Sequence, residues 1–140
     1  MMEVINIHYL DIFGTGEVLR PCGLTTDESM NLYVAATASS RIVKFNEQGK
    51  FLMDFGKGEG GLFKKVGKLT NPTGVAVDKE GNCYAADVNS NCVYKFDAQG
   101  RFLLKFGNSG KGDGEFDRCR SLRLGSDGCL WVVDAYNNRI

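Results

Sequence analysis

Histidine is almost missing from this chain, which has one, His8, among its 140 residues. Hydrolytic sites of the Ser-His-Asp or Cys-His kind need a histidine beside a nucleophile and an orienting acid, and a zinc site needs several clustered Cys or His ligands. No motif places His8 in such a cluster, and the five scattered cysteines form no Cys-x-x-Cys pair. The sequence therefore predicts a protein that is not an enzyme and holds no metal or cofactor.

The chain also lacks net charge and long apolar runs. Lys plus Arg number 17 and so do Asp plus Glu, so nothing global draws the chain to nucleic acid or to an anionic membrane. No apolar stretch reaches membrane-spanning length, and the first residues do not have the pattern of a signal peptide. We therefore expect a cytoplasmic protein with reduced thiols and no membrane partner.

Proline is scarce and glycine is not, with two of the former and 18 of the latter. A hydrophobic content of 43% excludes a disordered linker as the reason for so much glycine. Many tight turns between short strands explain the composition better, because glycine adopts the positive φ that such turns require. The composition thus indicates a globular chain rich in turns.

An internal repeat accounts for the turns. The text from Gly23 to Gly56 returns without a gap from Gly74 to Gly107, and a third copy begins near Ser121 and reaches Ile140. A period of about 40 to 50 residues is typical of propellers and solenoids, in which each unit buries its faces only against its neighbours. The three copies fill nearly the whole chain.

Each full copy holds four short apolar segments separated by turn residues. They are 22–26, 31–36, 41–46 and 50–55 in the first copy, 73–78, 82–87, 92–97 and 101–106 in the second, and 120–125, 129–134 and a stub at 138–140 in the third. Their length and punctuation predict antiparallel strands, four to a blade. The fold class we predict is an all-β β-propeller of four-stranded antiparallel blades, with blade one at 22–56, blade two at 73–107 and an incomplete third at 120–140.

Three blades are too few to close a ring, since propellers have about four to eight. The segment 1–14 ends in Phe13-Gly14, as the full copies end in Phe55-Gly56 and Phe106-Gly107, so it predicts a last strand that completes a blade. We therefore expect a homodimer in which each N-terminal strand completes the partner's C-terminal blade of a six-bladed ring. The alternative is a fragment cut from a longer gene, with open edges.

The second copy resembles the NHL repeat. The resemblance rests on Pro-x-Gly-Val-Ala-Val-Asp at 72–78, Gly-Asn-x-Tyr-x-Ala-Asp at 81–87 and the asparagine Asn91 before the third strand. It implies a six-bladed propeller and, depending on the branch of the family, protein partners, single-stranded RNA or lyase chemistry. The first copy departs from the pattern at Met30, Ala36 and Ser40, so we expect its second-to-third turn to have a different shape.

Loops on one face of such a propeller carry most of the variable charge. The turn from strand two to three and the loop from strand four to the next blade lie on the same face, where propellers usually bind partners. The candidate partner-binding residues there are Lys57, Lys64, Lys65, Lys68, Asn89, Arg118, Arg120 and Tyr136. The prediction is a non-catalytic scaffold for a protein partner, and the alternative is a solvated charged rim.

Two further alternatives stay open. Single-stranded RNA could bind the basic loops if Phe63 or Tyr136 were exposed for base stacking, and a small-molecule or lyase-type site could lie in the central channel. The run from Asp87 to Asn91 resembles the start of a calcium loop but lacks the glycine and the distal glutamate that follow in such a loop. We interpret the repeated Asp87 and Asp134, and likewise Asn91 and Asn138, instead as turn residues whose side chains bond nearby backbone amides.

Overall fold

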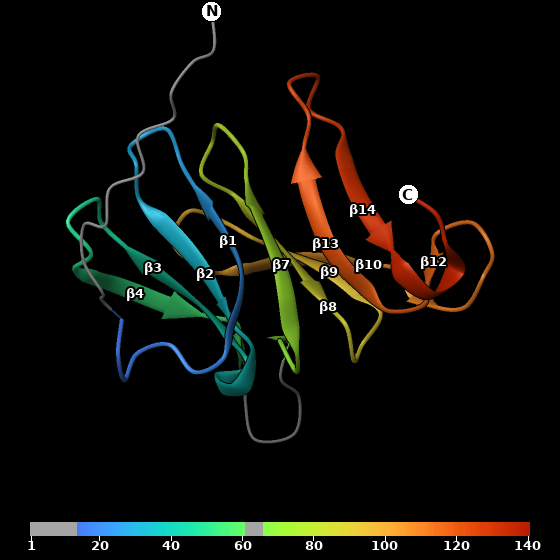
Figure 1. The fold of residues 1–140 in the computed structure, drawn as a ribbon, viewed down its shortest axis with the longest axis horizontal. Helices are drawn as coiled ribbons and strands as arrows, with labels where there is room; N and C mark the ends of the chain where they lie inside the picture. The colour runs from blue at the N-terminus through green and yellow to red at the C-terminus, as the bar shows by residue number, and fades with distance from the viewer. Residues whose placement is uncertain (1–13, 61–65) are drawn as a thin grey trace, which may run out of the picture.

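Two four-stranded antiparallel sheets and a two-stranded sheet follow one another along the chain (Figure 1). The computed structural model describes residues 14–60 and 66–140, so the strand expected before Gly14 lies outside the described residues. The first sheet consists of β1 (Pro21–Thr26), β2 (Leu32–Ala36), β3 (Arg41–Phe45) and β4 (Phe51–Phe55). The second consists of β7 (Pro72–Val77), β8 (Cys83–Asp87), β9 (Cys92–Phe96) and β10 (Phe102–Phe106).

The third sheet pairs β13 (Cys119–Leu124) with β14 (Leu130–Asp134). The expected third strand of this copy is present only as a bridge between Asp134 and Arg139. Short strands fill the connections: β5 (Lys57–Glu59) pairs with β6 (Val66–Lys68), and β11 (Asn108–Ser109) pairs with β12 (Glu115–Phe116). The 3-10 turns η1 (Thr37–Ser39) and η2 (Ala135–Asn137) are the only helices among the described residues, and neither is long and apolar enough to span a membrane.

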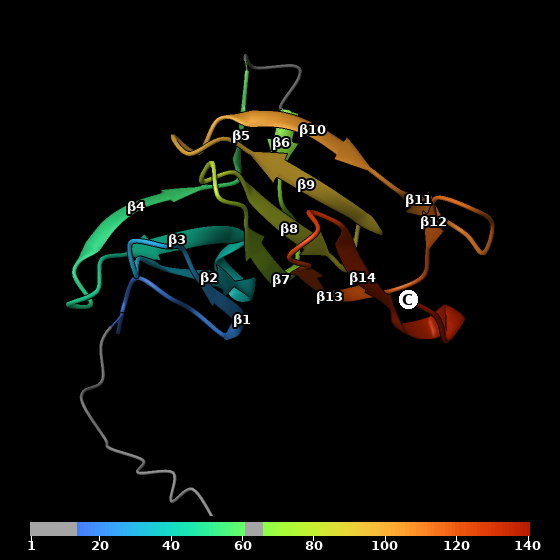
Figure 2. The same cartoon turned by 90° about the horizontal axis from the view of Figure 1, so that it is seen from above.

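The three sheets stand side by side in an arc, with the first strand of each on the inner side (Figure 2). β7 packs between β1 and β13, while β4 and β10 form the outer edge. The repeated glycine of the first strand makes the close approach possible. A Cβ added at Gly23 would lie 2.5 Å from the carbonyl oxygen of Thr73, and one added at Gly74 would lie 2.9 Å from the Cα of Ser121.

Apolar side chains fill the spaces between neighbouring sheets. One cluster joins the first and second sheets, where the rings of Phe55 and Phe96 lie 5.2 Å apart, and another joins the second and third around Val93 and Leu122. The middle strands are buried on both faces, which explains why they are apolar almost throughout, as in strands covered on both sides. All-β architecture with antiparallel four-stranded sheets is thus confirmed, whereas closure by a second chain stays a prediction.

The turn between the second and third strands keeps one shape in all three copies. Its last residue is left-handed each time, with φ of 53° at Ser40, 51° at Asn91 and 53° at Asn138. The expectation that Ser40 changes this turn is therefore wrong. The backbone geometry is set by the pairing of the flanking strands, so serine adopts a conformation that asparagine tolerates better.

Met30 occupies a position where the other copies have glycine. Its φ is 61°, against 83° at both Gly81 and Gly128, and its side chain is 59% exposed. A Cβ in this conformation is strained, whereas an exposed side chain adds little burial. We expect Met30→Gly to raise the free energy of unfolding by about 0.5 to 1 kcal/mol, since relief of strain outweighs the added entropy of the unfolded chain.

Denaturant unfolding measures this effect, and Met30→Ala is the control because it shortens the side chain but keeps the Cβ. The alanine variant should match the wild type in stability. Equal stability of the glycine variant and the alanine variant would show that the turn is not strained.

Candidate functional site at the start of the inner strands

A hollow of about 330 Å³ opens where the three inner strands begin. Its walls come from the segments that enter β1, β7 and β13 and from the neighbouring second-to-third turns. The lining residues are Arg20, Pro21, Cys22, Thr37, Asn71, Thr73, Val88, Arg118 and Arg120, and we call this site the arginine hollow.

The repeat itself builds the arginine hollow. Arg20, Asn71 and Arg118 occupy one and the same position in the three copies, just before the first strand. Cys22, two residues after Arg20, also lines the hollow, and so do its counterparts Thr73 and Arg120 in the other two copies. Side chains from successive sheets therefore converge around the inner side of the arc, as expected when each unit of a repeat protein presents the same position to a common axis.

The arginine hollow is positively charged. Three of its residues are arginines, and none of those lining it is acidic. Guanidinium groups present several donors in a planar fork that fits carboxylate and phosphate groups. The chemistry of the hollow therefore favours an anionic ligand.

The buried carboxylate of Asp87, at the end of β8, fixes the backbone that leads into β7 beside the arginine hollow. Asp87 is fully buried, and its Oδ2 accepts hydrogen bonds from the backbone N–H of Thr70 at 2.5 Å and of Asn71 at 2.9 Å. Its Oδ1 accepts from the Thr70 hydroxyl and from the N–H groups of Asn89 and Ser90. The carboxylate thus ties the segment that enters β7 to the turn after β8, in agreement with the turn role expected for it.

Asp134 does the same in the third sheet. It accepts from the Asp117 N–H at 2.7 Å and from the side chains of Asn137 and Arg139, each at 2.8 Å. Burial raises the pKa of this carboxyl, but these bonds and the nearby Arg139 outweigh burial and lower its pKa below the usual value. In the first sheet Ala36 stands at this position, so no carboxylate joins Arg20 to its turn. The Thr37 N–H donates to the Arg20 carbonyl at 3.2 Å, a backbone bond that the other two sheets have as well.

The structure brings four of the predicted site residues together. Arg118 and Arg120 both line the arginine hollow, and the guanidinium of Arg118 lies 5.5 Å from the centre of the Tyr136 ring. Asn89 lies beside them, because its Oδ1 accepts a hydrogen bond from the side chain of Asn71 at 3.2 Å.

The predicted lysines lie elsewhere. Lys57 and Lys68 face each other in the β5–β6 hairpin, and Lys57 is paired with Asp54 at 2.8 Å. This hairpin packs against the outer strand β10, where the Glu59 carboxylate accepts from the N–H of Phe102. Lys64 and Lys65, like Phe63, fall outside the described residues.

Arg20 and Asn71 were missed from the sequence. The signal that could have found them is their alignment with Arg118, since the repeat assigns all three to one position. Charge indicated Arg118 and Arg120 but also the lysines, which belong to a connection that each copy builds differently. Cys119 lies behind the hollow as a buried thiol, and burial, with the nearby Asp87 charge, raises its pKa to about 12.

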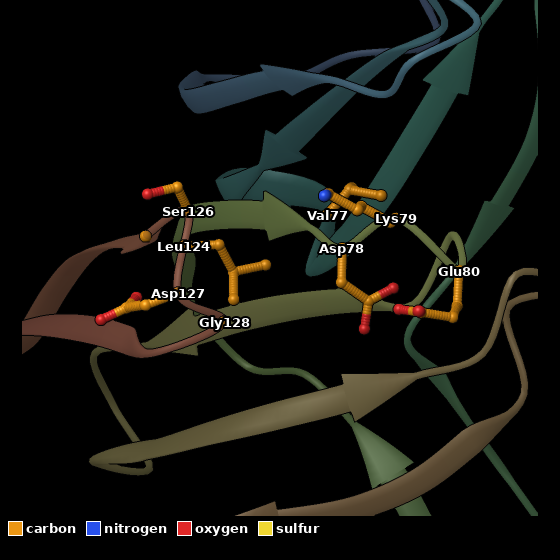
Figure 3. Close-up of a pocket in the computed structure, with 9 residues that line it drawn as sticks. Val77, Asp78, Lys79, Glu80, Leu124, Ser126, Asp127 and Gly128 are labelled. Carbon is orange, nitrogen blue, oxygen red and sulfur yellow. The ribbon is translucent and has the colours of Figure 1, made fainter.

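A second hollow of about 460 Å³ lies at the other end of the inner strands, between the turns after β7 and β13 (Figure 3). Asp78 and Glu80 lie on one side, whereas Asp127 on the other side points away from them (Figure 3). Asp78 accepts hydrogen bonds from Asn82 and from the Tyr84 hydroxyl, so it shapes its own turn. No group of three potential metal ligands occurs among the described residues.

Similarity to known proteins connects this fold with lyases. The chain is 30% identical, over 94% of its length, to the probable peptidyl-alpha-hydroxyglycine alpha-amidating lyase pgal-1 of Caenorhabditis elegans, of which it spans 39%. It is 40% identical over 58 residues to the protein brain tumor of Drosophila melanogaster. The matched residues make up 41% of this chain and 5% of that protein. No family model matches the chain.

Solved structures of the same kind match at low identity. Streptogramin B lyase has a TM-score of 0.61 at 18% identity, with 82% of this chain and 34% of that one covered. An inactive variant of virginiamycin B lyase from Staphylococcus aureus with quinupristin has a TM-score of 0.63 at 18% identity, with 85% and 36% covered. These neighbours are β-propellers, and the fold of this chain is therefore that of a β-propeller segment.

These matches correct the expectation that the chain is not an enzyme. The relative that matches most of the chain is named as a lyase, and so are the two structures above. The expectation depended on the lack of a complete catalytic set in this sequence, but the chain spans only 39% of that relative. A site on the axis of a propeller collects side chains from blades all around the ring, so a part of the ring need not contain the full set.

Proposed function

We propose that this chain is a three-blade part of an NHL-type β-propeller of the lyase kind, and that the arginine hollow binds an anionic group of its ligand. The convergence of Arg20, Asn71 and Arg118 from one repeat position carries the proposal. A residue at this position in any further blade would extend the same ring of side chains around the axis.

The named lyase suggests the ligand. A peptidyl-alpha-hydroxyglycine ends in a carboxylate, and amidation removes that charge. Arginine binds a carboxylate through two parallel hydrogen bonds, and the polar side chains of Asn71 and Thr73 in the same hollow suit the flanking peptide groups. The three arginines thus match the charged end of a peptide substrate.

A binding experiment on the full chain tests this proposal. A peptide that ends in glycine with a free carboxylate is titrated against the protein, followed by amide NMR shifts, and the same peptide as its amide is the reference. We expect the carboxylate to bind at least about tenfold more tightly, because a charged pair of hydrogen bonds is lost in the amide. Arg118→Ala should remove most of that preference.

Arg101→Ala is the matched control, since Arg101 sits on an exposed turn in an ion pair with Asp97 outside the hollow. It should leave binding unchanged. Equal binding of the acid and the amide, or equal losses in the two variants, would contradict the proposal.

Exposed apolar residues support further blades around the ring. Phe55 is buried against the next sheet, whereas its repeat counterpart Phe106 is 39% exposed, and Trp131 of β14 is 57% exposed. Further blades would cover these side chains as the second sheet covers Phe55.

We propose that a second copy of the chain supplies these further blades. A monomeric mass in solution for the folded chain would exclude this dimer.

A further inference from the structure

Contacts from two sheets fix the position of Arg118. Its backbone N–H donates to the Oδ1 of Asn91, from the turn of the second sheet, at 2.8 Å. Its own sheet holds the preceding residue, because the Asp117 N–H donates to the buried Asp134. The Tyr136 ring lies against the guanidinium. Backbone and side chain are thus held separately, by contacts from both sides of the junction.

The orientation of the Asn91 amide is itself fixed. Its Nδ2 donates to the hydroxyl of Ser109 at 2.9 Å, so its oxygen is left facing Arg118. Asn91 therefore fastens the loop between the second and third sheets at both of its ends. This matters because Arg118 has a φ of 60°, a conformation that arginine rarely adopts unless the surroundings impose it.

The equivalent junction between the first and second sheets is built differently. Ser40 has the same φ as Asn91, but its hydroxyl donates to the carbonyl of Thr70 at 2.7 Å and does not bond the N–H of Asn71. The two turn residues have the same backbone conformation but different hydrogen-bond partners. Ser40 bonds a carbonyl oxygen, whereas Asn91 bonds a backbone N–H group. Only at the second junction does the turn residue bind the amide of a residue in the arginine hollow.

We propose that Asn91 is a positioning residue, which directs Arg118 into the arginine hollow from the neighbouring sheet and so sets the affinity of the hollow for carboxylates. The proposal rests on the function proposed above for the same hollow. Asn91 does not line the hollow, and it acts only through the backbone of Arg118. Loss of its oxygen frees the N–H of Arg118 and lets the left-handed residue relax, which moves the guanidinium away from the Tyr136 ring.

The experiment compares Asn91→Gly with Ser40→Gly in the full chain. Glycine adopts positive φ without strain, so each variant keeps its turn. Ser40→Gly loses the bond to the Thr70 carbonyl, whereas Asn91→Gly loses the bonds to the Arg118 N–H and to the Ser109 hydroxyl. The first readout needs no ligand. The Tyr136 ring shifts the NMR signals of the Arg118 side chain, and this ring-current shift should collapse in Asn91→Gly and persist in Ser40→Gly.

The second readout is binding of the glycine-ended peptide with a free carboxylate. Asn91→Gly should weaken this binding roughly three- to tenfold, because the Arg118 N–H loses the acceptor that positions it, while Ser40→Gly binds as the wild type does. Asn91→Ser serves if the glycine variant does not fold, because Ser40 shows that serine fits this turn.

The outcomes separate the two proposals. A wild type that does not prefer the carboxylate overturns the proposed function, whereas the ring-current shift still decides whether Asn91 positions Arg118. An unchanged shift in Asn91→Gly, or a carboxylate preference that survives it in full, overturns the positioning role alone.

Discussion

Replacing Gly74 with alanine is expected to lower the free energy of unfolding by about 3 kcal/mol. The added Cβ would lie 2.9 Å from the Cα of Ser121, 3.1 Å from the carbonyl oxygen of Arg120 and 3.2 Å from the amide nitrogen of Leu122. All three atoms belong to the backbone of β13, so no side-chain rotation relieves the clash. The inner strands β7 and β13 must move apart to accommodate the methyl group.

Gly74 is required for space and not for backbone freedom. It is absent from the residues with positive φ, so alanine could adopt its conformation without strain. The whole cost therefore measures how closely adjacent inner strands pack around the axis. Gly23 meets the backbone of β7 in the same way, which explains why the repeat keeps this glycine in both full copies.

Gly112→Ala is the control for Gly74→Ala. Gly112 also lacks positive φ, but its added Cβ would meet the end of the flexible Glu115 side chain at 3.2 Å, which can move aside. Denaturant unfolding should show a large loss for Gly74→Ala and a small one for Gly112→Ala. Similar stability of the two variants would mean that the inner strands are not in such close contact.

The sequence predicts the strands well because the repeat supplies several readings of one structure. Turn residues such as Gly81 and Gly128 mark the same boundary in different copies, so an ambiguous segment in one copy is settled by another. Met30 and Ser40 show the limit of this reasoning. A departure from the repeat suggested a departure in shape, but strand pairing on both sides fixes the turn, and the two residues accept an unfavourable φ instead.

The candidate site was only half predicted. Arg118 and Arg120 were found by charge, but charge also selected Lys57 and Lys68, which lie on a hairpin against the outer strand β10. The radial position of a residue in a propeller depends on which strand it precedes, and the position before the first strand faces the axis. Arg20 shares that position, so the repeat and not the charge indicates the site.

Asp87→Asn is expected to cost about 3 kcal/mol of the free energy of unfolding, because the buried carboxylate accepts five hydrogen bonds and donates none. One oxygen receives the N–H groups of Thr70 and Asn71, and the other receives those of Asn89 and Ser90. Asparagine has a single acceptor oxygen. In either orientation its NH₂ group faces two backbone N–H groups, which lose their acceptor in a site without access to water.

The matched control is Asp97→Asn, in the turn before β10. The first copy already has asparagine, Asn46, at this position. Asn46 accepts hydrogen bonds from the N–H groups of Gln48 and Lys50, and Asp97 accepts the equivalent bonds from Gln99 and Arg101. One acceptor oxygen is enough for the two N–H groups, and the ion pair of Oδ2 with Arg101 is exposed and contributes little, so stability should stay nearly unchanged. Thermal or denaturant unfolding distinguishes the two variants, and equal losses would mean that charge, and not the number of accepted bonds, determines the effect. Since Asp87 also fixes Asn71 at the arginine hollow, the same substitution should weaken carboxylate binding at temperatures where the variant remains folded.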